Sequence, residues 1–268
     1  MNVLSLFDGM SCGQIALDQL GMKVDNYYAA EIDKYAIQIA KKNYPNTIHL
    51  GDVTSVYAQH LPKIDLLMGG SPCQGFSFAG KQLNFDDPRS ALFFEFVKLL
   101  KECKPKYFLL ENVRMSLQCQ DIITEHLGWV EPMRINSALV SAQNRQRLYW
   151  TNIPNLTQPD DRNILLSDIL EEDATEPMLS NIYGGFKEKK PRVHYGKSVT
   201  IRTAAGGGHI PSVTLKGGGI RKLTPTECEK LQTVPEGYTE SVSNTQRYRM
   251  IGNGWTVEVI KHILKEMI

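Results

Sequence analysis

A cysteine stands in a short polar segment that directly follows an apolar run. Cys73 lies in GGSPCQGFS, residues 69–77, after the apolar IDLLM. Glu111 ends a second apolar run in KYFLLENV, and Arg145 and Arg147 stand two residues apart in QNRQRLYW. A thiolate is a strong nucleophile that nearby cations favour, and a carboxyl group can move a proton. These residue types indicate nucleophilic catalysis, although a cysteine or an arginine pair taken alone is more often packing or a surface ion pair.

A second set of residues has the chemistry of a nucleoside site. Gly9 lies in FDGMSCG, a turn between an apolar run and a helical pattern, and Glu31 ends the next apolar run. A carboxylate at that position can bind ribose hydroxyls, and Asp52, after a third run, can accept from an adenine amino group. An adenosine cofactor is therefore expected. The turn lacks G-x-G-x-x-G, which disfavours a dinucleotide, but a nicotinamide cofactor stays open.

The first 150 residues alternate apolar runs with amphipathic stretches, which predicts strands and helices in turn. Such alternation is typical of right-handed crossovers in a parallel sheet, beyond whose strand ends ligands bind. We therefore predict an α/β fold with a doubly wound, mostly parallel sheet. Strands are expected in NVLSLF, VDNYYAAEI, TIHLGD, KIDLLMGG and KYFLLENV, and helices in CGQIALDQLG, DKYAIQIAKKNY and SALFFEFVKLLKEC.

The sequence changes character after residue 153. Nine of the 21 glycines fall between Gly184 and Gly219, which predicts a loop-rich lobe with short strands over residues 154–220. The predicted organisation is a catalytic and cofactor-binding domain of residues 1–153, this small lobe, and C-terminal helices in residues 221–268.

The C-terminal segment has clear helix signals. Thr224 can cap a helix whose first residue is Pro225. Two further helices are expected in residues 244–268, with a break at Gly252–Gly254. The last helix is apolar on one face and is expected to return to the first domain.

Charge is strongly segregated along the chain, although the net charge is only +1. Residues 154–180 hold seven acidic residues and one basic residue, whereas residues 181–222 hold nine basic residues and one acidic residue. A basic segment of this kind favours an anionic partner such as nucleic acid, since phosphate contacts supply most sequence-independent affinity. A solvated charged loop is the alternative.

The remaining composition indicates a soluble, cytoplasmic protein without a metal. The five cysteines are odd in number, scattered, and form no C-x-x-C pair, so neither a disulfide framework nor a zinc site is expected. No run approaches about eighteen apolar residues, and the first ten residues lack the pattern of a signal peptide. No membrane partner is expected.

Nine short segments form an ordered series of motifs. They are FDGMSCG, AEIDKYA, GDVT, GGSPCQGFSFAGKQ, LFFEF, ENV, QNRQRLYW, RKLTPTE and GNGWTV. In this order they resemble the motifs of the cytosine-C5 DNA methyltransferases over nearly the whole chain. The first motif and RLYWTNIP look more like the eukaryotic de novo enzymes, whereas QNRQR is bacterial in style. The resemblance implies a Rossmann-like methyltransferase fold in a bacterial cell or a phage-infected host.

The resemblance also implies a mechanism. The Cys73 thiolate adds to C6 of cytosine, which makes C5 able to attack the methyl group of S-adenosylmethionine. Glu111 donates a proton to N3, Arg147 contacts the O2 atom, and Arg145 assists at the active site. Because the base is inside a duplex, the enzyme must rotate it out of the stack.

The same resemblance assigns contacts to the cofactor S-adenosylmethionine, whose product is S-adenosylhomocysteine. Two departures from the family pattern concern this site: Cys12 replaces the second glycine of the first turn, so Gly13 is expected to take over its role, and Gly254 with Trp255 replaces Ser-Val. The predicted cofactor contacts are Phe7, Gly9, Met10, Glu31, Ile32, Asp52, Val53, Pro72, Leu92 and Asn253.

DNA contacts are expected in two regions. The long segment after Cys73 is predicted to be a mobile loop that closes over the DNA. The glycine-rich lobe is predicted to choose a short target sequence, with Thr200, Ile201 and Arg202 matching the recognition region of the family. The predicted DNA-binding residues are Gln74, Ser77, Lys81, Lys187, Lys189, Lys190, Arg192, Thr200 and Arg202.

Three alternatives stay open at this point. An RNA cytosine-C5 methyltransferase of the same fold would keep Cys73 and Glu111. A non-catalytic DNA-binding relative is disfavoured by the intact PCQ, ENV and QNRQR motifs. A nicotinamide oxidoreductase has no need for Cys73. The expected partners are double-stranded DNA and a cognate restriction endonuclease, and the chain is expected to be a monomer.

Overall fold

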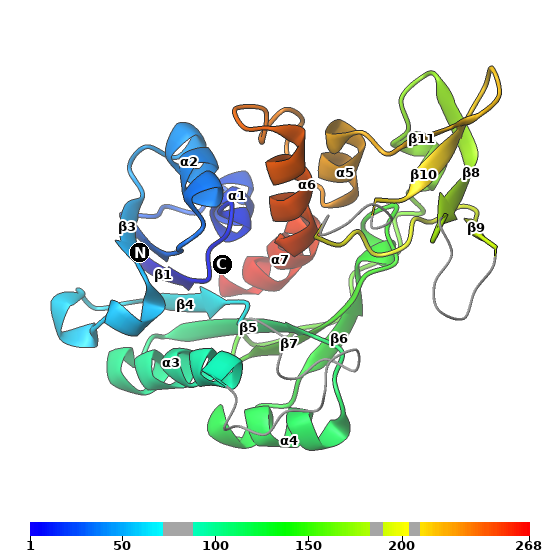
Figure 1. The fold of residues 1–268 in the computed structure, drawn as a ribbon. Helices are drawn as coiled ribbons and strands as arrows, with labels where there is room; N and C mark the ends of the chain where they lie inside the picture. The colour runs from blue at the N-terminus through cyan, green and yellow to red at the C-terminus, as the bar shows by residue number, and fades with distance from the viewer. Residues whose placement is uncertain (72–87, 183–189, 204–209) are drawn as a thin grey trace. The chain divides into compact units, whose positions relative to one another are not determined.

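Apolar strands followed by amphipathic helices build the N-terminal half of the computed structural model (Figure 1). The structure describes residues 1–71, 88–182, 190–203 and 210–268. By compactness these residues fall into two units. The first unit comprises Met1–Ile135, Gln146–Gln158 and Lys261–Ile268, and the second comprises Asn136–Arg145 and Pro159–Ile260. This division does not test the predicted functional segments 1–153, 154–220 and 221–268, which stay a prediction.

Within the described residues, seven strands form one sheet in the order β3-β2-β1-β4-β5-β7-β6. The pairs among β1 to β5 are parallel, and β7 is antiparallel to β5. The predicted doubly wound, mostly parallel sheet is therefore confirmed. The strands are β1 (Asn2–Leu6), β2 (Asn26–Ala30), β3 (Ile48–Gly51), β4 (Leu66–Gly69), β5 (Tyr107–Val113), β6 (Met133–Asn136) and β7 (Gln146–Thr151).

The central strands β1, β4 and β5 are almost entirely buried because both faces of the sheet are covered. Figure 1 shows α1 and α2 on one side of the strands and α3 and α4 on the other. Phe93 and Phe96 of α3 pack with Trp150 of β7 in one buried core. The helices are α1 (Cys12–Gln19), α2 (Lys34–Asn43), α3 (Pro88–Cys103) and α4 (Leu117–His126).

The second unit contains an antiparallel sheet, in the order β11-β10-β8-β9 over the described residues. Met178 of β8 and Val213 of β10 are fully buried. The short strands of this region agree with the expectation from its glycine content. They are β8 (Ala174–Ser180), β9 (Arg192–His194), β10 (Ser212–Leu215) and β11 (Ile220–Lys222).

The C-terminal helices are α5 (Pro225–Leu231), α6 (Asn244–Asn253) and α7 (Val257–Leu264). The Thr224 side chain accepts from the Glu227 amide, which confirms the predicted cap. The break between α6 and α7 begins at Gly254, and Gly252 lies in the last turn of α6. Short 3₁₀ turns are η1 (Val53–Ser55), η2 (Ala58–His60), η4 (Ser137–Leu139), η5 (Leu166–Asp168) and η6 (Lys265–Met267).

Two further observations concern the described part of the chain. None of its helices has the length and apolar character needed to span a bilayer. It also contains no cluster of three or more His, Cys, Asp or Glu residues that could hold a metal ion.

Candidate active site

The turn after β1 is held in an unusual backbone conformation. Phe7 and Ser11 have φ angles of 57° and 64°, in the left-handed region that costs a side chain energy. Two contacts to the end of β2 compensate: the Asp8 amide donates to the Ala30 carbonyl at 3.1 Å, and the Gly9 amide donates to Glu31 at 2.8 Å. Strained backbone of this kind is concentrated at functional sites.

Asp8 is the least expected residue of this turn. Its carboxylate accepts from the hydroxyls of Ser11 and, at 2.7 Å, of Tyr27. Burial raises the pKa of Asp8 to about 6, although these hydroxyl groups oppose the shift. The sequence reasoning missed Asp8, and the signal was present: an acidic residue that directly follows a buried strand.

Glu31 is fixed by three amides. One oxygen accepts from Gly9, and the other accepts from Ile32 and Asp33, each at 2.8 Å. A carboxylate has about four lone-pair positions, so capacity for a ribose hydroxyl remains. The adjacent Ile32 side chain is 74% exposed, and an apolar surface at a strand end fits the face of an adenine ring.

The other described cofactor candidates of the first unit lie around the same strand ends. The Asp52 carboxylate accepts from the amide and the hydroxyl of Thr54, which lowers the pKa of Asp52 below its ordinary value. Met10 and Val53 are buried. Phe7 and Leu92 are half-buried against the core.

The glycine that follows Cys12 has a packing role. A side-chain carbon at Gly13 would lie 2.5 Å from the terminal methyl group of Met68, which is fully buried on β4. Gly13 therefore allows the first turn of α1 to approach the sheet. Cys12 itself is the buried first residue of α1.

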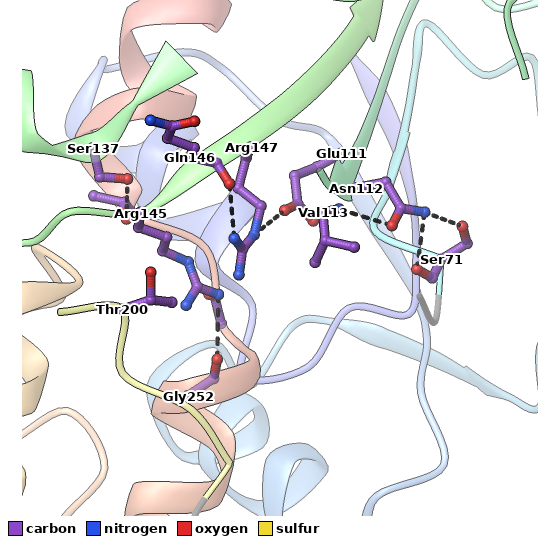
Figure 2. A network of polar contacts seen from close by, with 12 residues as sticks. Ser71, Glu111, Asn112, Val113, Ser137, Arg145, Gln146, Arg147, Thr200 and Gly252 are labelled. Atoms are coloured by element: carbon purple, nitrogen blue, oxygen red, sulfur yellow. Dashed lines mark hydrogen bonds and ion pairs between the residues drawn. The ribbon is translucent and has the colours of Figure 1, made fainter. Parts of the chain in front are cut away.

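Glu111 and Arg147 form the central ion pair of the first unit (Figure 2). β7 runs antiparallel to β5, which places Arg147 opposite Val113 and on the same face as Glu111. The Arg147 Nε and Glu111 Oε1 atoms are 2.9 Å apart, and the two side chains are only 15% and 11% exposed. Two of the predicted catalytic residues thus meet at the end of β5.

The neighbouring Asn112 connects β5 to the end of β4. Its amide donates to the Ser71 hydroxyl at 3.1 Å and to the Ser71 carbonyl at 3.4 Å (Figure 2). Both residues are buried. The chain is therefore fixed two residues before Cys73. Pro72, Cys73, Gln74, Ser77 and Lys81 lie outside the described residues.

Arg145 has different partners from Arg147. It belongs to the second unit, is 4% exposed, and donates to the carbonyls of Ile201, Gly252 and Gly254 at 3.1, 3.2 and 2.9 Å. Figure 2 shows its guanidinium group turned toward Gly252. Asn253, the remaining cofactor candidate, ends α6 between these two glycines.

The described basic residues that are predicted to contact DNA are exposed. They are Lys190, Arg192 and Arg202. Within the same unit, Lys197 donates to three backbone carbonyls, and Arg221 pairs with acidic residues. The Thr200 hydroxyl donates to the Asn144 carbonyl at 2.6 Å. Lys187 and Lys189 lie outside the described residues.

Comparison with known proteins decides the family. The model of the C-5 cytosine-specific DNA methylase family matches residues 1–200 and 177–268 of the chain. The chain belongs to the C-5 cytosine-specific DNA methylase family. It is thus a cytosine-C5 DNA methyltransferase, as the resemblance of its motifs predicts.

Individual members of this family match the cytosine-C5 methyltransferase over its full length. The Type II methyltransferase M1.ScrFI of Lactococcus lactis subsp. cremoris is 32% identical, and the alignment covers 99% of this chain and 77% of that one. The Type II methyltransferase M.HhaI of Haemophilus parahaemolyticus is 28% identical, with 98% and 93% covered.

Solved structures share the fold. A putative DNA modification methyltransferase encoded within an Escherichia coli prophage has a TM-score of 0.70 at 23% identity, with 100% of this chain and 98% of that chain covered. The Entamoeba histolytica methyltransferase EhMeth has a TM-score of 0.76 at 15% identity, with 100% and 97% covered. These similarities support the Rossmann-like methyltransferase fold.

Proposed function

We propose that this cytosine-C5 methyltransferase methylates a flipped-out cytosine in duplex DNA through a covalent bond to Cys73, with S-adenosylmethionine as methyl donor. The observation that carries the proposal is the Glu111–Arg147 pair at the end of β5, together with Asn112 holding Ser71 just before the cysteine. The pair places a carboxyl group and a cation beside the strand that leads to the nucleophile.

Each proposed step follows from what these side chains can do. The Cys73 thiolate forms a bond to C6, and the ring electrons move toward C5 while Glu111 supplies a proton at N3. S-adenosylmethionine supplies an electrophilic methyl group; C5 takes it as the methyl–sulfur bond breaks, and S-adenosylhomocysteine is left. Loss of the C5 proton to a base then restores the C5–C6 double bond as the Cys73 sulfur leaves as a thiolate, and N3 returns its proton to Glu111.

Arg147 has two roles in this proposal. It holds Glu111 in one orientation through the 2.9 Å contact, and a second nitrogen donates to the Gln146 carbonyl at 2.8 Å, which fixes the guanidinium group. Its positive charge favours the thiolate of a nearby cysteine. A fixed cation also stabilises negative charge that develops at cytosine O2.

The first-unit residues fit S-adenosylmethionine. Glu31 is oriented by three amides to accept a ribose hydroxyl, and the exposed Ile32 offers an apolar face to adenine. Asp52 is ionised and can accept from the adenine amino group. Gly9 and Met10 contribute backbone near the methionine moiety, and Phe7, Val53, Leu92 and Pro72 complete the first-unit set. Asn253, a residue of the second unit, is the remaining proposed contact.

The proposed DNA contacts lie in both predicted regions. Lys190 and Arg192 are exposed and can reach phosphates, and Arg202 can reach phosphates or base edges. Gln74, Ser77, Lys81, Lys187, Lys189 and Thr200 complete the set. Because two relatives are named Type II methyltransferases, we further propose that the enzyme acts alongside a restriction endonuclease of the same target sequence. We also propose that it is a cytoplasmic monomer.

A methyl-transfer assay tests the function. The purified chain with radiolabelled S-adenosylmethionine is expected to label duplex DNA and not folded RNA, and bisulfite sequencing is expected to find one short methylated sequence. S-adenosylhomocysteine, and not a nicotinamide dinucleotide, is expected to raise the melting temperature. Label only in RNA, or no label at all, would contradict the proposal.

A further inference from the structure

The second unit contains a buried cluster of polar side chains that we call the polar hub. Its members are each less than 5% exposed, although they carry amide, hydroxyl or guanidinium groups. Buried polar groups need partners, so such a cluster fixes the backbone that supplies them. The polar hub comprises Ser137, Gln143, Arg145, Gln232 and Thr256.

The polar hub holds the peptide groups of Ile201 from both sides. The Ile201 amide donates to the Gln143 side chain at 2.9 Å, and the Ile201 carbonyl accepts from Arg145 at 3.1 Å. The neighbouring Thr200 hydroxyl donates to the Asn144 carbonyl at 2.6 Å. Residues 200–202, which we call the recognition segment, are therefore fixed to residues 143–145.

The polar hub also holds the end of α6. The last carbonyls of a helix have no partner within it. Arg145 donates to the carbonyls of Gly252 and Gly254 at 3.2 and 2.9 Å. Gln232 donates to those of Ile251 and Gly254, both at 2.9 Å. One guanidinium group thus connects the recognition segment directly to the end of α6.

Close packing at Gly252 makes this connection tight. A side-chain carbon at this position would lie 2.3 and 2.4 Å from the carbonyl carbon and oxygen of Arg202, and 2.6 Å from the Thr203 amide nitrogen. These are backbone atoms, which cannot swing aside as a side chain can. Any residue larger than glycine must therefore change the distance between the end of α6 and the recognition segment.

The recognition segment has one buried and one exposed side. Ile201 is 4% exposed, whereas the Arg202 side chain is exposed. An arginine that is presented from a fixed backbone can donate two hydrogen bonds to a guanine edge in the major groove. A backbone shift of about 1 Å is enough to spoil such geometry.

We propose that Arg145 and Gly252 are positioning residues for sequence discrimination, because they fix the backbone from which Arg202 reads the DNA. This inference rests on the proposed function, since it requires DNA as the substrate. Arg145 acts through carbonyl oxygens of its own unit. Lysine at this position cannot replace the planar fork that reaches both segments at once.

The test compares methylation of two duplexes by the full chain. One duplex carries the sequence found by bisulfite sequencing, and the other carries a single changed base pair within it. A mismatched base pair costs about 1–3 kcal/mol, so wild type is expected to prefer the first duplex by roughly 5- to 150-fold in kcat/KM. Arg145→Lys and Gly252→Ala are each expected to reduce this ratio to within about threefold of one.

Gly217→Ala is the matched control. It adds the same methyl group in the same unit, at a glycine with nothing within 4 Å of the new atom, and is expected to keep the wild-type ratio. A merely structural loss would lower kcat/KM for both duplexes equally and leave the ratio unchanged. If Arg145→Lys does not fold, Gly252→Ala provides the test, since it leaves the five side chains of the polar hub unchanged.

The outcomes separate the two proposals. An unchanged ratio in the folded, active variants overturns the positioning role and leaves methyl transfer intact. Absence of methylation by wild type overturns the proposed function instead.

Discussion

Arg145 and Arg147 are two residues apart, yet they have different kinds of partner. Arg147 pairs with the carboxylate of Glu111, and both side chains are largely shielded from solvent. Arg145 donates to three backbone carbonyls of the second unit. An arginine beside a carboxyl group can orient that group for proton transfer and stabilise negative charge, whereas an arginine surrounded by carbonyls fixes the backbone.

The comparison shows that the two arginines differ in their partners, and not in residue type. The sequence treats both arginines as one motif, QNRQR. The structure assigns Arg145 and Arg147 to different units, because the unit boundary falls between Arg145 and Gln146. Glu111→Gln tests this distinction directly.

Glu111→Gln is expected to have the largest effect. Glutamine keeps an acceptor for Arg147 and nearly the same volume, so the fold should persist, but it has no carboxyl proton to donate. We expect kcat to fall by roughly 100- to 1000-fold. Single-turnover methylation of duplex DNA measures this loss.

The control for this variant is Glu95→Gln, which changes another carboxylate of an ion pair, 3.2 Å from Lys98 on α3. It is expected to keep the wild-type rate. A Glu111→Gln enzyme with normal kcat would show that the Glu111–Arg147 pair only holds the fold, as the contacts of Arg145 do.

Removal of two exposed basic residues is expected to have an intermediate effect, on the salt dependence of DNA binding. Changing Lys190 and Arg192 together to glutamine removes two proposed phosphate contacts, so the slope of log Kd against log salt should decrease by about 2. Titration of a labelled duplex at several salt concentrations measures the slope.

The control variant is Lys216→Gln with Lys222→Gln. It removes the same charge from the same unit and is expected to leave the slope nearly unchanged. Equal flattening by both pairs would mean that net charge, and not position, sets DNA binding.

Asp8→Asn is expected to have the smallest effect, and it depends on pH. Burial raises the pKa of Asp8 to about 6, so the folded state binds this proton more tightly than the unfolded state does. The stability contributed by Asp8 is therefore full below about pH 4 and is lost as pH rises through 6. Above pH 6 the Asp8→Asn variant avoids a buried charge, so its free energy of unfolding should exceed that of wild type by about 1 kcal/mol. Urea unfolding at pH 5 and 8 measures the difference, and a gain that is the same at both values would be inconsistent with a titrating Asp8.

The fold was accessible from the sequence because its signals are local. Uninterrupted apolar runs followed by amphipathic stretches predict buried parallel strands with helical crossovers, and β1 to β5 confirm this. The cap at Thr224 and the proline after it also depend on adjacent residues, and α5 begins there. Glu111 could be placed at a strand end for the same reason.

The partners of these residues could not be predicted, because they depend on strand register and on contacts far apart in the chain. The pairing of Glu111 with Arg147 requires β7 to lie antiparallel beside β5. The contacts of Arg145 join residues 56 and 109 positions away. The sequence predicts a helix break at Gly252–Gly254, yet Gly252 lies inside α6. A glycine is needed there because a side chain would collide with the backbone of Arg202.

Covalent trapping tests the central claim most directly. A duplex that carries 5-fluorocytosine at the target position cannot lose the atom at C5, so the enzyme should remain attached after methyl transfer. Mass spectrometry of the digested complex is expected to find the base on the Cys73 sulfur, with Cys119→Ser trapped normally and Cys73→Ser not trapped. Attachment through another residue, or no attachment although ordinary DNA is methylated, would contradict covalent catalysis by Cys73.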